Sequence, residues 1–162
     1  MHPFRIRPAR APADIATAAA LFEEYAAGLG VDLGYQGFPA ELAGLPGAYA
    51  PPAGELLLAL AWGDSDDALG CVALRPLEGG RVCEMKRLYV RPAGRRLGLG
   101  QALVAAVVAR AAALGYAEMK LDTLPSMGAA AALYRKFGFT EIAPYYASPI
   151  AGTLYLSRAL SR

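Results

Sequence analysis

The spacing of apolar residues along this chain follows two patterns, and each pattern predicts a different kind of element. Alternating or short unbroken apolar runs between Gly, Pro and Asp predict strands, whereas apolar residues three and four apart predict helices. The predicted strands are 4–7, 55–62, 69–77, 81–90, 117–123, 139–142 and 153–160. The predicted helices are 14–27, a short one near 39–43, 98–114 and 127–137.

Residues at the ends of these runs favour helix starts, helix ends and turns. Asp14 is predicted to be the N-cap of the first helix, and Ser126 that of the last. Gly115 and Gly138 are predicted to end helices, since glycine readily adopts the left-handed conformation found there. Residues 63–67 predict a turn between two strands. The order of elements predicts an α/β sheet, partly antiparallel, with helices on both faces.

The composition limits the class of protein. With 162 residues, 56% of them hydrophobic and 19% charged, the chain is expected to form one domain over residues 1–162. A net charge of +2 without a basic tract argues against a nucleic-acid partner. No apolar run reaches the ~20 residues of a membrane span, and residues 1–5 do not resemble a signal peptide. We therefore expect a cytoplasmic protein with no membrane partner.

Cysteine and histidine offer little material for metal or redox chemistry. Cys71 and Cys83 lie in strand-like runs without the spacing of a zinc or redox motif, so both are expected to be buried free thiols. His2 is the only histidine. We therefore expect no metal site.

The most distinctive segment is Arg95–Gly100, which leads from the strand 81–90 into an alanine-rich helix. Gly98 and Gly100 let a ligand approach the backbone, because glycine has no Cβ. A helix start offers unpaired N–H groups and the positive end of the helix dipole. Arg95 and Arg96, with Arg91 nearby, add charge that binds phosphate. The segment therefore predicts a pyrophosphate site.

These glycines allow three other interpretations. A P-loop is excluded, because no lysine follows Gly100. A dinucleotide fingerprint is weakened, since Leu103 stands where a third glycine is needed, although Glu118 or Asp122 lies where a ribose-binding acid is expected. The glycines could also do no more than shape a turn.

Motifs on both sides of this segment resemble the GNAT superfamily of acetyl-CoA-dependent N-acetyltransferases. The family's pyrophosphate signature Gln/Arg-x-x-Gly-x-Gly/Ala is matched by Arg95, Gly98 and Gly100. Its later motif Leu-Tyr-x-x-x-Gly-Phe is matched by residues 133–139. The resemblance is specific from about Val82 to Phe139. It implies a GNAT-like fold, in which a mixed sheet of six to seven strands has helices on both faces.

The resemblance also implies where acetyl-CoA binds. In the family, a bulge splays the fourth strand from its parallel neighbour, and pantetheine pairs with the main chain there, here at Leu88 and Val90. Met127 stands where many members have a cofactor-binding Asn, so Ser126 or backbone groups are expected to replace it. The expected cofactor-binding residues are Leu88, Tyr89, Val90, Arg95, Arg96, Leu97, Gly98, Leu99, Gly100, Gln101, Ser126 and Tyr134.

The implied reaction transfers an acetyl group directly from a thioester to an amine. An alkyl ammonium group with a pKa near ~10 must first lose a proton. Glu84 lies four residues before Leu88, where some family members hold a glutamate base, so Glu84 or a water relay is expected to be the base. An ion pair of Glu84 with Lys86, Arg87 or Arg81 is an equal alternative. Tyr134 is expected to be the general acid that protonates the thiolate.

The acceptor is expected to be a primary amine of a small molecule, such as an amino acid. The regions that form the family's acceptor site hold aromatic residues and an acid that suit a small cation, namely Tyr25, Asp32, Tyr35, Tyr49, Tyr145 and Tyr146. Lys86 and Arg87 could hold the carboxylate of an amino acid.

Other readings stay open at this point. A non-catalytic acyl-CoA-binding module of the same fold and a dinucleotide-dependent oxidoreductase are the alternative functions. The closing strand, within residues 152–160, could pair across a homodimer.

Overall fold

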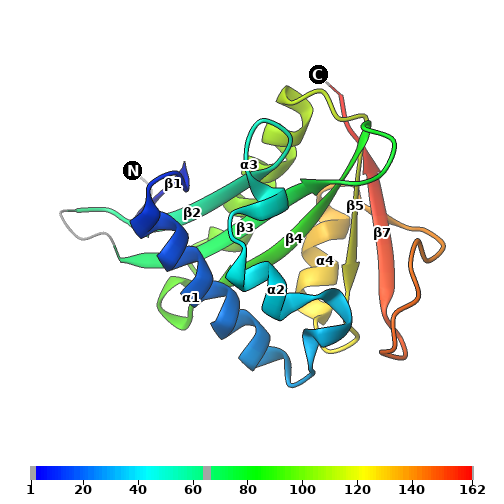
Figure 1. The fold of residues 1–162 in the computed structure, drawn as a ribbon, viewed down its shortest axis with the longest axis horizontal. Helices are drawn as coiled ribbons and strands as arrows, with labels where there is room; N and C mark the ends of the chain where they lie inside the picture. The colour runs from blue at the N-terminus through cyan, green and yellow to red at the C-terminus, as the bar shows by residue number, and fades with distance from the viewer. Residues whose placement is uncertain (1–2, 64–66, 162) are drawn as a thin grey trace.

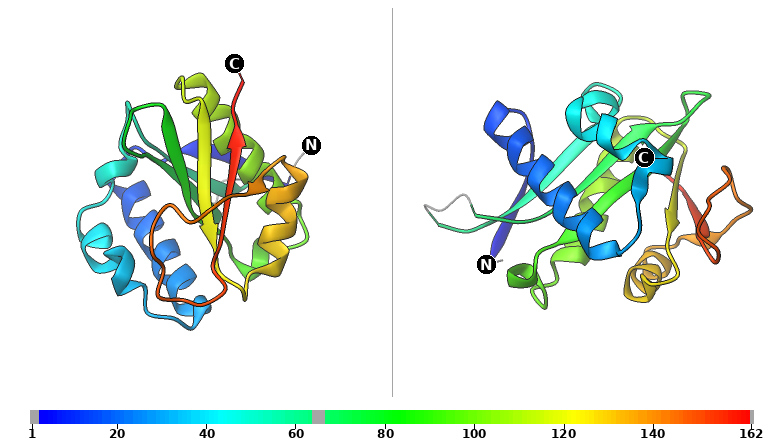
Figure 2. Two further views of the ribbon diagram at one scale, coloured as in Figure 1. Left: turned by 90° about the vertical axis from the view of Figure 1, so that its right-hand side faces the viewer. Right: turned by 60° about the horizontal axis from the view of Figure 1, so that its bottom comes forward.

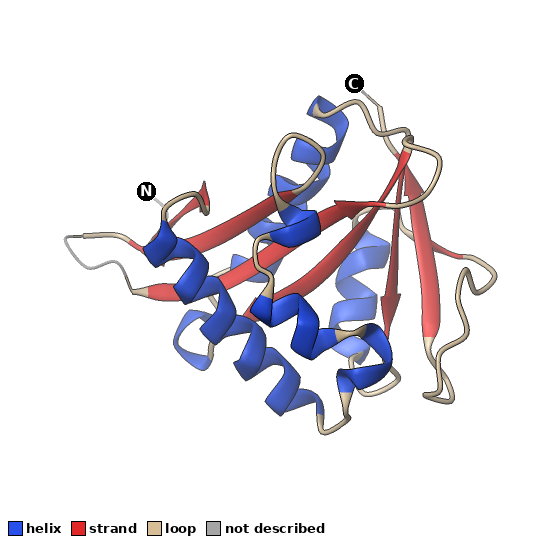
Figure 3. Ribbon diagram, in the orientation of Figure 1, coloured by secondary structure: helices blue, strands red, loops and turns tan. Residues whose placement is uncertain are grey.

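The protein contains a seven-stranded mixed sheet (Figure 1, Figure 3). The computed structural model describes residues 3–63 and 67–161, so His2 and part of the predicted turn 63–67 lie outside the described residues. The strands are β1 (Phe4–Pro8), β2 (Glu55–Ala61), β3 (Ala68–Pro76), β4 (Val82–Val90), β5 (Glu118–Thr123), β6 (Thr140–Glu141) and β7 (Leu154–Ala159). Their spatial order is β1-β2-β3-β4-β5-β7-β6, with β4 and β5 parallel. The fold class predicted from the sequence is confirmed.

Helices cover both faces of the sheet (Figure 2). The helices α1 (Pro12–Leu29) and α2 (Phe38–Ala43) lie on one face, called here the α1/α2 face. The helices α3 (Leu99–Ala113) and α4 (Gly128–Lys136) lie on the other, the α3/α4 face. Short 3₁₀ helices η1 (Leu33–Gln36), η2 (Gly47–Tyr49) and η3 (Pro92–Gly94) occupy connections that the pattern left unassigned. No helix in the described part of the chain is long and apolar enough to cross a membrane.

Each face of the sheet has its own hydrophobic core. Val72 and Leu74 of β3 pack under α3, whereas Cys71 and Ala73 of the same strand pack under α1. Because β3 is buried on both faces, its sequence is an apolar run rather than an alternation. Cys71 and Cys83 are buried free thiols, as expected.

The predicted N-cap at Asp14 is wrong. The helix α1 begins at Pro12 with Ala11 as its N-cap, so Asp14 lies within the first turn. Its Oδ2 atom accepts hydrogen bonds from the backbone N–H groups of Arg10 and Ala11 at 3.1 and 3.3 Å. Both of its carboxylate oxygens also bind the Arg7 guanidinium, at 2.8 and 2.9 Å. The Asp14 carboxylate therefore binds free N–H groups at the start of the helix from a position inside the helix. The sequence pattern does not distinguish this position from that of an N-cap.

The predicted N-cap at Ser126 is also wrong, whereas the glycine ends are confirmed. Met127 is the N-cap of α4, and it makes no side-chain capping hydrogen bond. Gly115 and Gly138 follow the helices α3 and α4 with φ of 93° and 87°. These left-handed conformations are the reason that glycine ends a helix at low energetic cost.

The parallel pairing of β4 with β5 is short. Residues 82–84 of β4 pair with residues 118–120 of β5. Beyond this point the two strands diverge, which is visible as the V between them in Figure 1. The backbone of β4 from Met85 onward therefore has no β5 partner on that side.

A β-bulge lies in the unpaired half of β4. Cys71 of β3 pairs with Tyr89, but Ala73 pairs with Lys86, so two residues of β4 oppose one residue of β3. One of these two is Arg87, whose φ is 60°. The bulge interrupts the alternation of side chains, and both Lys86 and Arg87 contact elements of the α1/α2 face. The splayed strand implied by the family resemblance is present.

The strand β7 lies between β5 and β6, not at the edge of the sheet. β6 pairs with it at Leu156 and Ser157. The pairing that we considered across a homodimer is therefore blocked along this part of β7. The homodimer itself stays a prediction.

Replacing Asp14 by Asn should lower stability at neutral pH but not in acid. The Arg7 guanidinium lowers the pKa of Asp14 from 3.8 to about 2. A carboxyl with a lowered pKa stabilises the fold above the unfolded-state pKa, and this contribution is lost as the pH falls through the folded-state pKa. We expect D14N to lower the free energy of unfolding by about 1–2 kcal/mol near neutral pH, with the difference shrinking between about pH 4 and pH 2.

Urea unfolding of both proteins across this pH range measures the effect. Asp32→Asn is the matched control, because Asp32 is an exposed N-cap of η1 and Asn caps equally well. A difference between D14N and the parent protein that does not change with pH would contradict the role of the Asp14 charge.

Candidate functional site

A narrow cavity lies where β4 and β5 diverge. It is bounded by α1, η1, the residues Met85–Leu88 of β4, the end of β5 and the start of α4. Tyr134 of α4 and Thr123 of β5 belong to its lining. The sequence predicted Tyr134 and Leu88 at this place, and the structure brings both into the same cavity.

Tyr134 and Thr123 bring hydroxyl groups to this cavity. Tyr134 is 5% exposed, and its ring meets Phe139 edge to face at 5.9 Å. Burial raises the pKa of Tyr134, so its hydroxyl remains protonated at neutral pH. Thr123 is 2% exposed, and its Oγ1 atom has no hydrogen-bond partner among the described residues. A buried polar atom without a partner is unfavourable, so this hydroxyl is suited to bind a ligand.

Arg87 is held entirely by protein groups. Its guanidinium donates two hydrogen bonds to Glu41, each 2.9 Å, and a third to Gln36 Oε1 at 2.8 Å. It also lies over the ring of Phe38 at 5.0 Å. Burial opposes the charge of Arg87, but the Glu41 carboxylate outweighs this effect and raises the pKa of Arg87. Three of the five N–H donors of Arg87 are therefore already used by protein groups, which leaves it less available than Lys86 to hold a substrate carboxylate.

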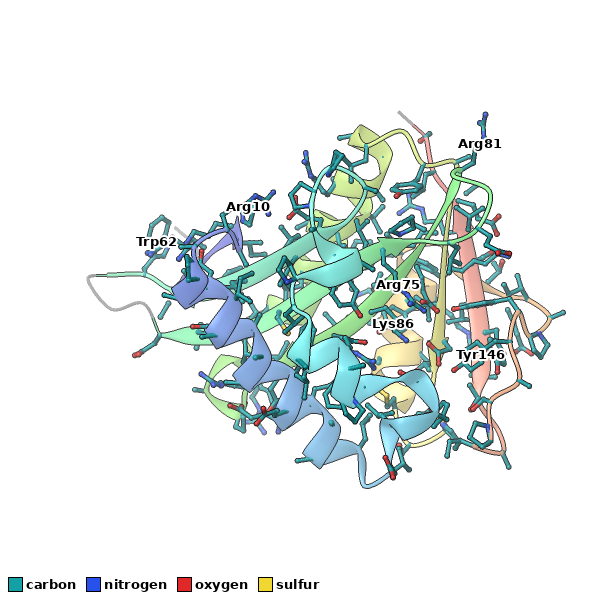
Figure 4. The ribbon with its side chains drawn as sticks, in the orientation of Figure 1. Arg10, Trp62, Arg75, Arg81, Lys86 and Tyr146 are labelled. Carbon is teal, nitrogen blue, oxygen red and sulfur yellow. The ribbon has the colours of Figure 1, made fainter. Side chains whose placement is uncertain are left out.

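Lys86 lines the same cavity with fewer partners. It is 7% exposed, and its Nζ atom donates to Gln36 Oε1 at 3.2 Å. Burial lowers the pKa of Lys86, because the charged ammonium loses its water. Figure 4 shows Lys86 close to Arg75 in this view.

Two adjacent tyrosines of the loop before β7 bind two carboxylates. Tyr145 donates to Glu84 Oε2 at 2.5 Å, and Tyr146 donates to Asp122 Oδ2. Arg75 also donates to Glu84, at 2.8 Å. Asp122 belongs to the lining of the cavity, whereas Glu84 does not. The ion pair of Glu84 is thus with Arg75, a partner that the sequence did not indicate.

The loop from β4 to α3 has the backbone expected of an anion site. Arg96 and Gly98 are both left-handed, with φ of 67° and 75°, and α3 begins at the next residue, Leu99. Arg95, Arg96, Leu97 and Gly98 are exposed, and Leu97 is 39% exposed. The first N–H groups of α3 have no intrahelical acceptor. Within the described residues, no ion pair uses Arg95 or Arg96.

Arg91 does not belong to this anion site. Its guanidinium binds both carboxylate oxygens of Glu24 in α1, at 2.6 to 3.1 Å, and the carbonyl of Ala68 at 3.0 Å. The sequence grouped Arg91 with Arg95 and Arg96 because they are close in the chain. The correction follows from its ion pair with α1, which directs its charge away from a ligand.

The other expected cofactor residues differ in their burial and in what their side chains contact. Leu99 is 1% exposed and packs in the core, and Gln101 is exposed on the first turn of α3. A Cβ added to Gly100 would lie 3.5 Å from Leu133 Cδ2, an ordinary contact. The Tyr89 hydroxyl donates to Glu24, so the contribution expected from this residue is its main chain. Ser126 is exposed and does not line the cavity, whereas Met127 does.

The acceptor residues expected from the sequence are only partly brought together. Tyr25 lines the cavity, and Tyr35 accepts a hydrogen bond from Gln36 at 3.2 Å. Tyr49 is buried in the core of the α1/α2 face, next to Phe22. Asp32 accepts from the Gly34 N–H and does not line the cavity. These two residues are therefore not acceptor ligands in this arrangement.

Gln36 and Asp122 were not assigned to the acceptor site from the sequence. Lys120 and Asp122 share one face of β5, and they alternate with the buried residues of the other face. This alternation could have indicated that Asp122 faces the α1/α2 side. Gln36 lies in η1, where no periodic pattern points to a function. Within the described residues, no group of three or more His, Cys, Asp or Glu side chains could hold a metal ion.

Comparison with known proteins identifies the family. The sequence model of the Acetyltransferase (GNAT) family matches residues 21–139. An uncharacterized N-acetyltransferase of Schizosaccharomyces pombe is 41% identical over 157 residues, which cover 97% of this chain and 95% of that protein.

Solved structures share the fold. A GNAT acetyltransferase of Staphylococcus aureus, 18% identical, aligns with 98% of this chain and 99% of its own at a TM-score of 0.78. A protein of Salmonella typhimurium that was solved with acetyl-CoA as its cofactor is 20% identical and aligns with 99% of this chain and 95% of its own at a TM-score of 0.68. With the family match, the diverging strands and the left-handed loop before α3, this chain belongs to the GNAT family and is an acetyl-CoA-dependent N-acetyltransferase.

Proposed function

We propose that residues 1–162 form one domain that acetylates the primary amine of a small molecule. The observation that carries this proposal is the cavity between β4 and β5, in which two buried hydroxyls and three charged groups line the place where the strands diverge. The acceptor enters from the α1/α2 face, and acetyl-CoA lies along β4 and the loop 95–98.

Features of this chain fit acetyl-CoA. Arg95 and Arg96 are exposed beside the start of α3, where charge and free N–H groups suit a pyrophosphate. The backbone of β4 beyond Glu84 lacks a β5 partner and is able to pair with the amides of pantetheine. The unpartnered Thr123 hydroxyl lies in the cavity at the end of this path. When bound, acetyl-CoA supplies the acetyl group as an activated thioester.

Tyr134 is the proposed general acid. Its hydroxyl is buried in the cavity, and the raised pKa keeps a proton on its oxygen at neutral pH. No hydrogen bond to the Tyr134 hydroxyl is found within the part of the chain that the structure describes. This proton is therefore free to be delivered to the leaving thiolate.

Glu84 is the proposed base, and it acts through water. The Glu84 carboxylate is fixed by Arg75 and Tyr145, so it stays at one position on the α1/α2 face. Since Glu84 does not line the cavity, a proton removed from the acceptor reaches it through a water relay. An ion pair alone, with no proton transfer, is the alternative for this residue.

Replacing Arg95 by Ala should weaken acetyl-CoA binding by about tenfold, because a charge-assisted hydrogen bond to phosphate contributes roughly 1.5–3 kcal/mol. Calorimetric titration gives the dissociation constant, and a rise in melting temperature with ligand supports it. Arg81→Ala is the matched control, since Arg81 is exposed and lies at the opposite end of β4 (Figure 4). Equal affinity of R95A and R81A, or no stabilisation of the parent protein by acetyl-CoA, would count against the proposed phosphate site.

Replacing Tyr134 by Phe should lower kcat by at least about tenfold and leave the affinity for acetyl-CoA nearly unchanged, since only the proton donor is lost. Steady-state kinetics and calorimetry separate the two quantities. Tyr116→Phe is the control, because the Tyr116 hydroxyl donates to the Ala53 carbonyl at 2.6 Å and does not line the cavity. An unchanged kcat in Y134F would remove Tyr134 from the reaction.

Replacing Glu84 by Gln should lower the rate most at mildly acidic pH, where the acceptor amine is most strongly protonated and a base matters most. The rate constant kcat/KM measured from about pH 6 to pH 9 tests this. The same fold decrease at every pH would make Glu84 an ion-pair partner of Arg75 only.

A further inference from the structure

Six charged side chains gather on the α1/α2 face where β4 and β5 diverge, and four of them form two ion pairs. These pairs are Arg87 with Glu41, at 2.9 Å, and Arg75 with Glu84, at 2.8 Å. The remaining two are Lys86 and Asp122, and both line the cavity. Within residues 3–63 and 67–161, neither of them belongs to an ion pair.

A single neutral side chain separates Lys86 from Asp122. Gln36 Oε1 accepts from Lys86 Nζ at 3.2 Å, and Gln36 Nε2 lies 3.5 Å from Asp122 Oδ2. The same Oδ2 atom accepts from the Tyr146 hydroxyl. In the described residues, neutral groups thus make the direct hydrogen bonds to both charges, and Asp122 Oδ1 receives none.

This arrangement leaves two charges incompletely compensated in a narrow cavity. An ammonium group has three donors, and only one of those of Lys86 has a hydrogen-bond acceptor in the described residues. Glu84 and Asp122 both lie within electrostatic reach of Lys86. The Glu84 carboxylate, however, already binds Arg75 and Tyr145, and Gln36 stands between Asp122 and Lys86. The Lys86 ammonium is buried and the Asp122 carboxylate is half-buried, and neither has a directly bound counter-charge among the described residues. A ligand that brings both charges therefore improves the compensation of each.

We propose that this cavity binds its acceptor as a zwitterion, with the acceptor's carboxylate on Lys86 and its ammonium group on Asp122. The acceptor is therefore a free amino acid or a close analogue of one. This inference rests on the proposed function, because it names the substrate class of the same site.

The charges of the cavity disfavour other small amines. A polyamine or an aminoglycoside carries several positive charges and no carboxylate, so Lys86 would face a like charge. Arg87 is less available than Lys86 as the carboxylate ligand, since three of its five N–H donors already bind Glu41 and Gln36. Lys86 is thus the residue that distinguishes an amino acid from its amide.

The test compares the standard L-amino acids with their carboxamides, which keep the amine and lose the carboxylate charge. Release of free thiol from acetyl-CoA measures turnover, and calorimetry measures binding to the enzyme loaded with CoA, where no reaction takes place. We expect the preferred amino acid to exceed its amide in kcat/KM by at least about tenfold, since a hydrogen bond to a charged group is lost in the amide.

The variants separate the two charges. Lys86→Met should weaken binding and kcat/KM for the amino acid by at least about tenfold and leave the amide nearly unchanged. Asp122→Asn should weaken both ligands, because both carry the ammonium group. Lys120→Met is the control, since Lys120 lies over the Tyr145 ring at 5.4 Å and does not line the cavity. It should leave the preference intact.

The outcomes distinguish this inference from the proposed function. Acetylation of amides or polyamines as fast as of amino acids, or an equal loss for both ligands in K86M, would overturn the zwitterion site while the acetyltransferase function stands. Amino-acid binding that depends on Lys86 without acetylation of any amine would support the site and overturn the proposed reaction. The absence of amino-acid binding to the CoA-loaded enzyme would overturn the inference.

Discussion

The site depends on the early end of pairing between β4 and β5. After residue 84 of β4, the backbone of each strand loses its neighbour on that side, and a cavity opens through the sheet. A sheet interior normally pairs its backbone groups, so this opening must be held by other interactions. The bulge at Arg87 has that role, because it lets β4 remain paired with β3 while it turns away from β5.

Buried ion pairs stabilise the bulge and also determine which charges in the cavity have no ion-pair partner in the described part of the chain. A left-handed arginine is an uncommon conformation, and here its side chain binds Glu41 and Gln36 and packs over Phe38. Arg87 and Arg75 each form an ion pair with an acidic residue. Lys86 and Asp122 also line the cavity, and neither belongs to an ion pair within the described residues. The same network that fixes the backbone therefore determines which charges remain for a ligand.

The sequence predicted those features that depend on local signals. The strand 81–90, the helix start at Gly98 and the helix end at Gly138 follow from apolar runs and glycine, and each lies within one or two residues of its predicted position. Partners distant in the chain could not be predicted: Arg87 binds Glu41 from 46 residues away, and Arg91 binds Glu24 from 67 residues away. Asp14 and Ser126 were expected to be caps, but a cap is decided by backbone angles that composition does not determine. The sequence indicated Asp122 only as a possible ribose ligand. Its position at the end of β5, near Tyr134, places it in the lining of the cavity.

We propose that one path, from the loop before α3 along β4 to the cavity, holds acetyl-CoA. A titration of the ¹⁵N-labelled protein with acetyl-CoA, monitored through the backbone amide signal of each residue, tests this path. We expect shifts at residues 96–101, at 88–90 and at 123–124, with residues 44–49 of the α1/α2 face unchanged. Shifts that are confined to residues outside this path, or no shifts at saturating acetyl-CoA, would contradict it.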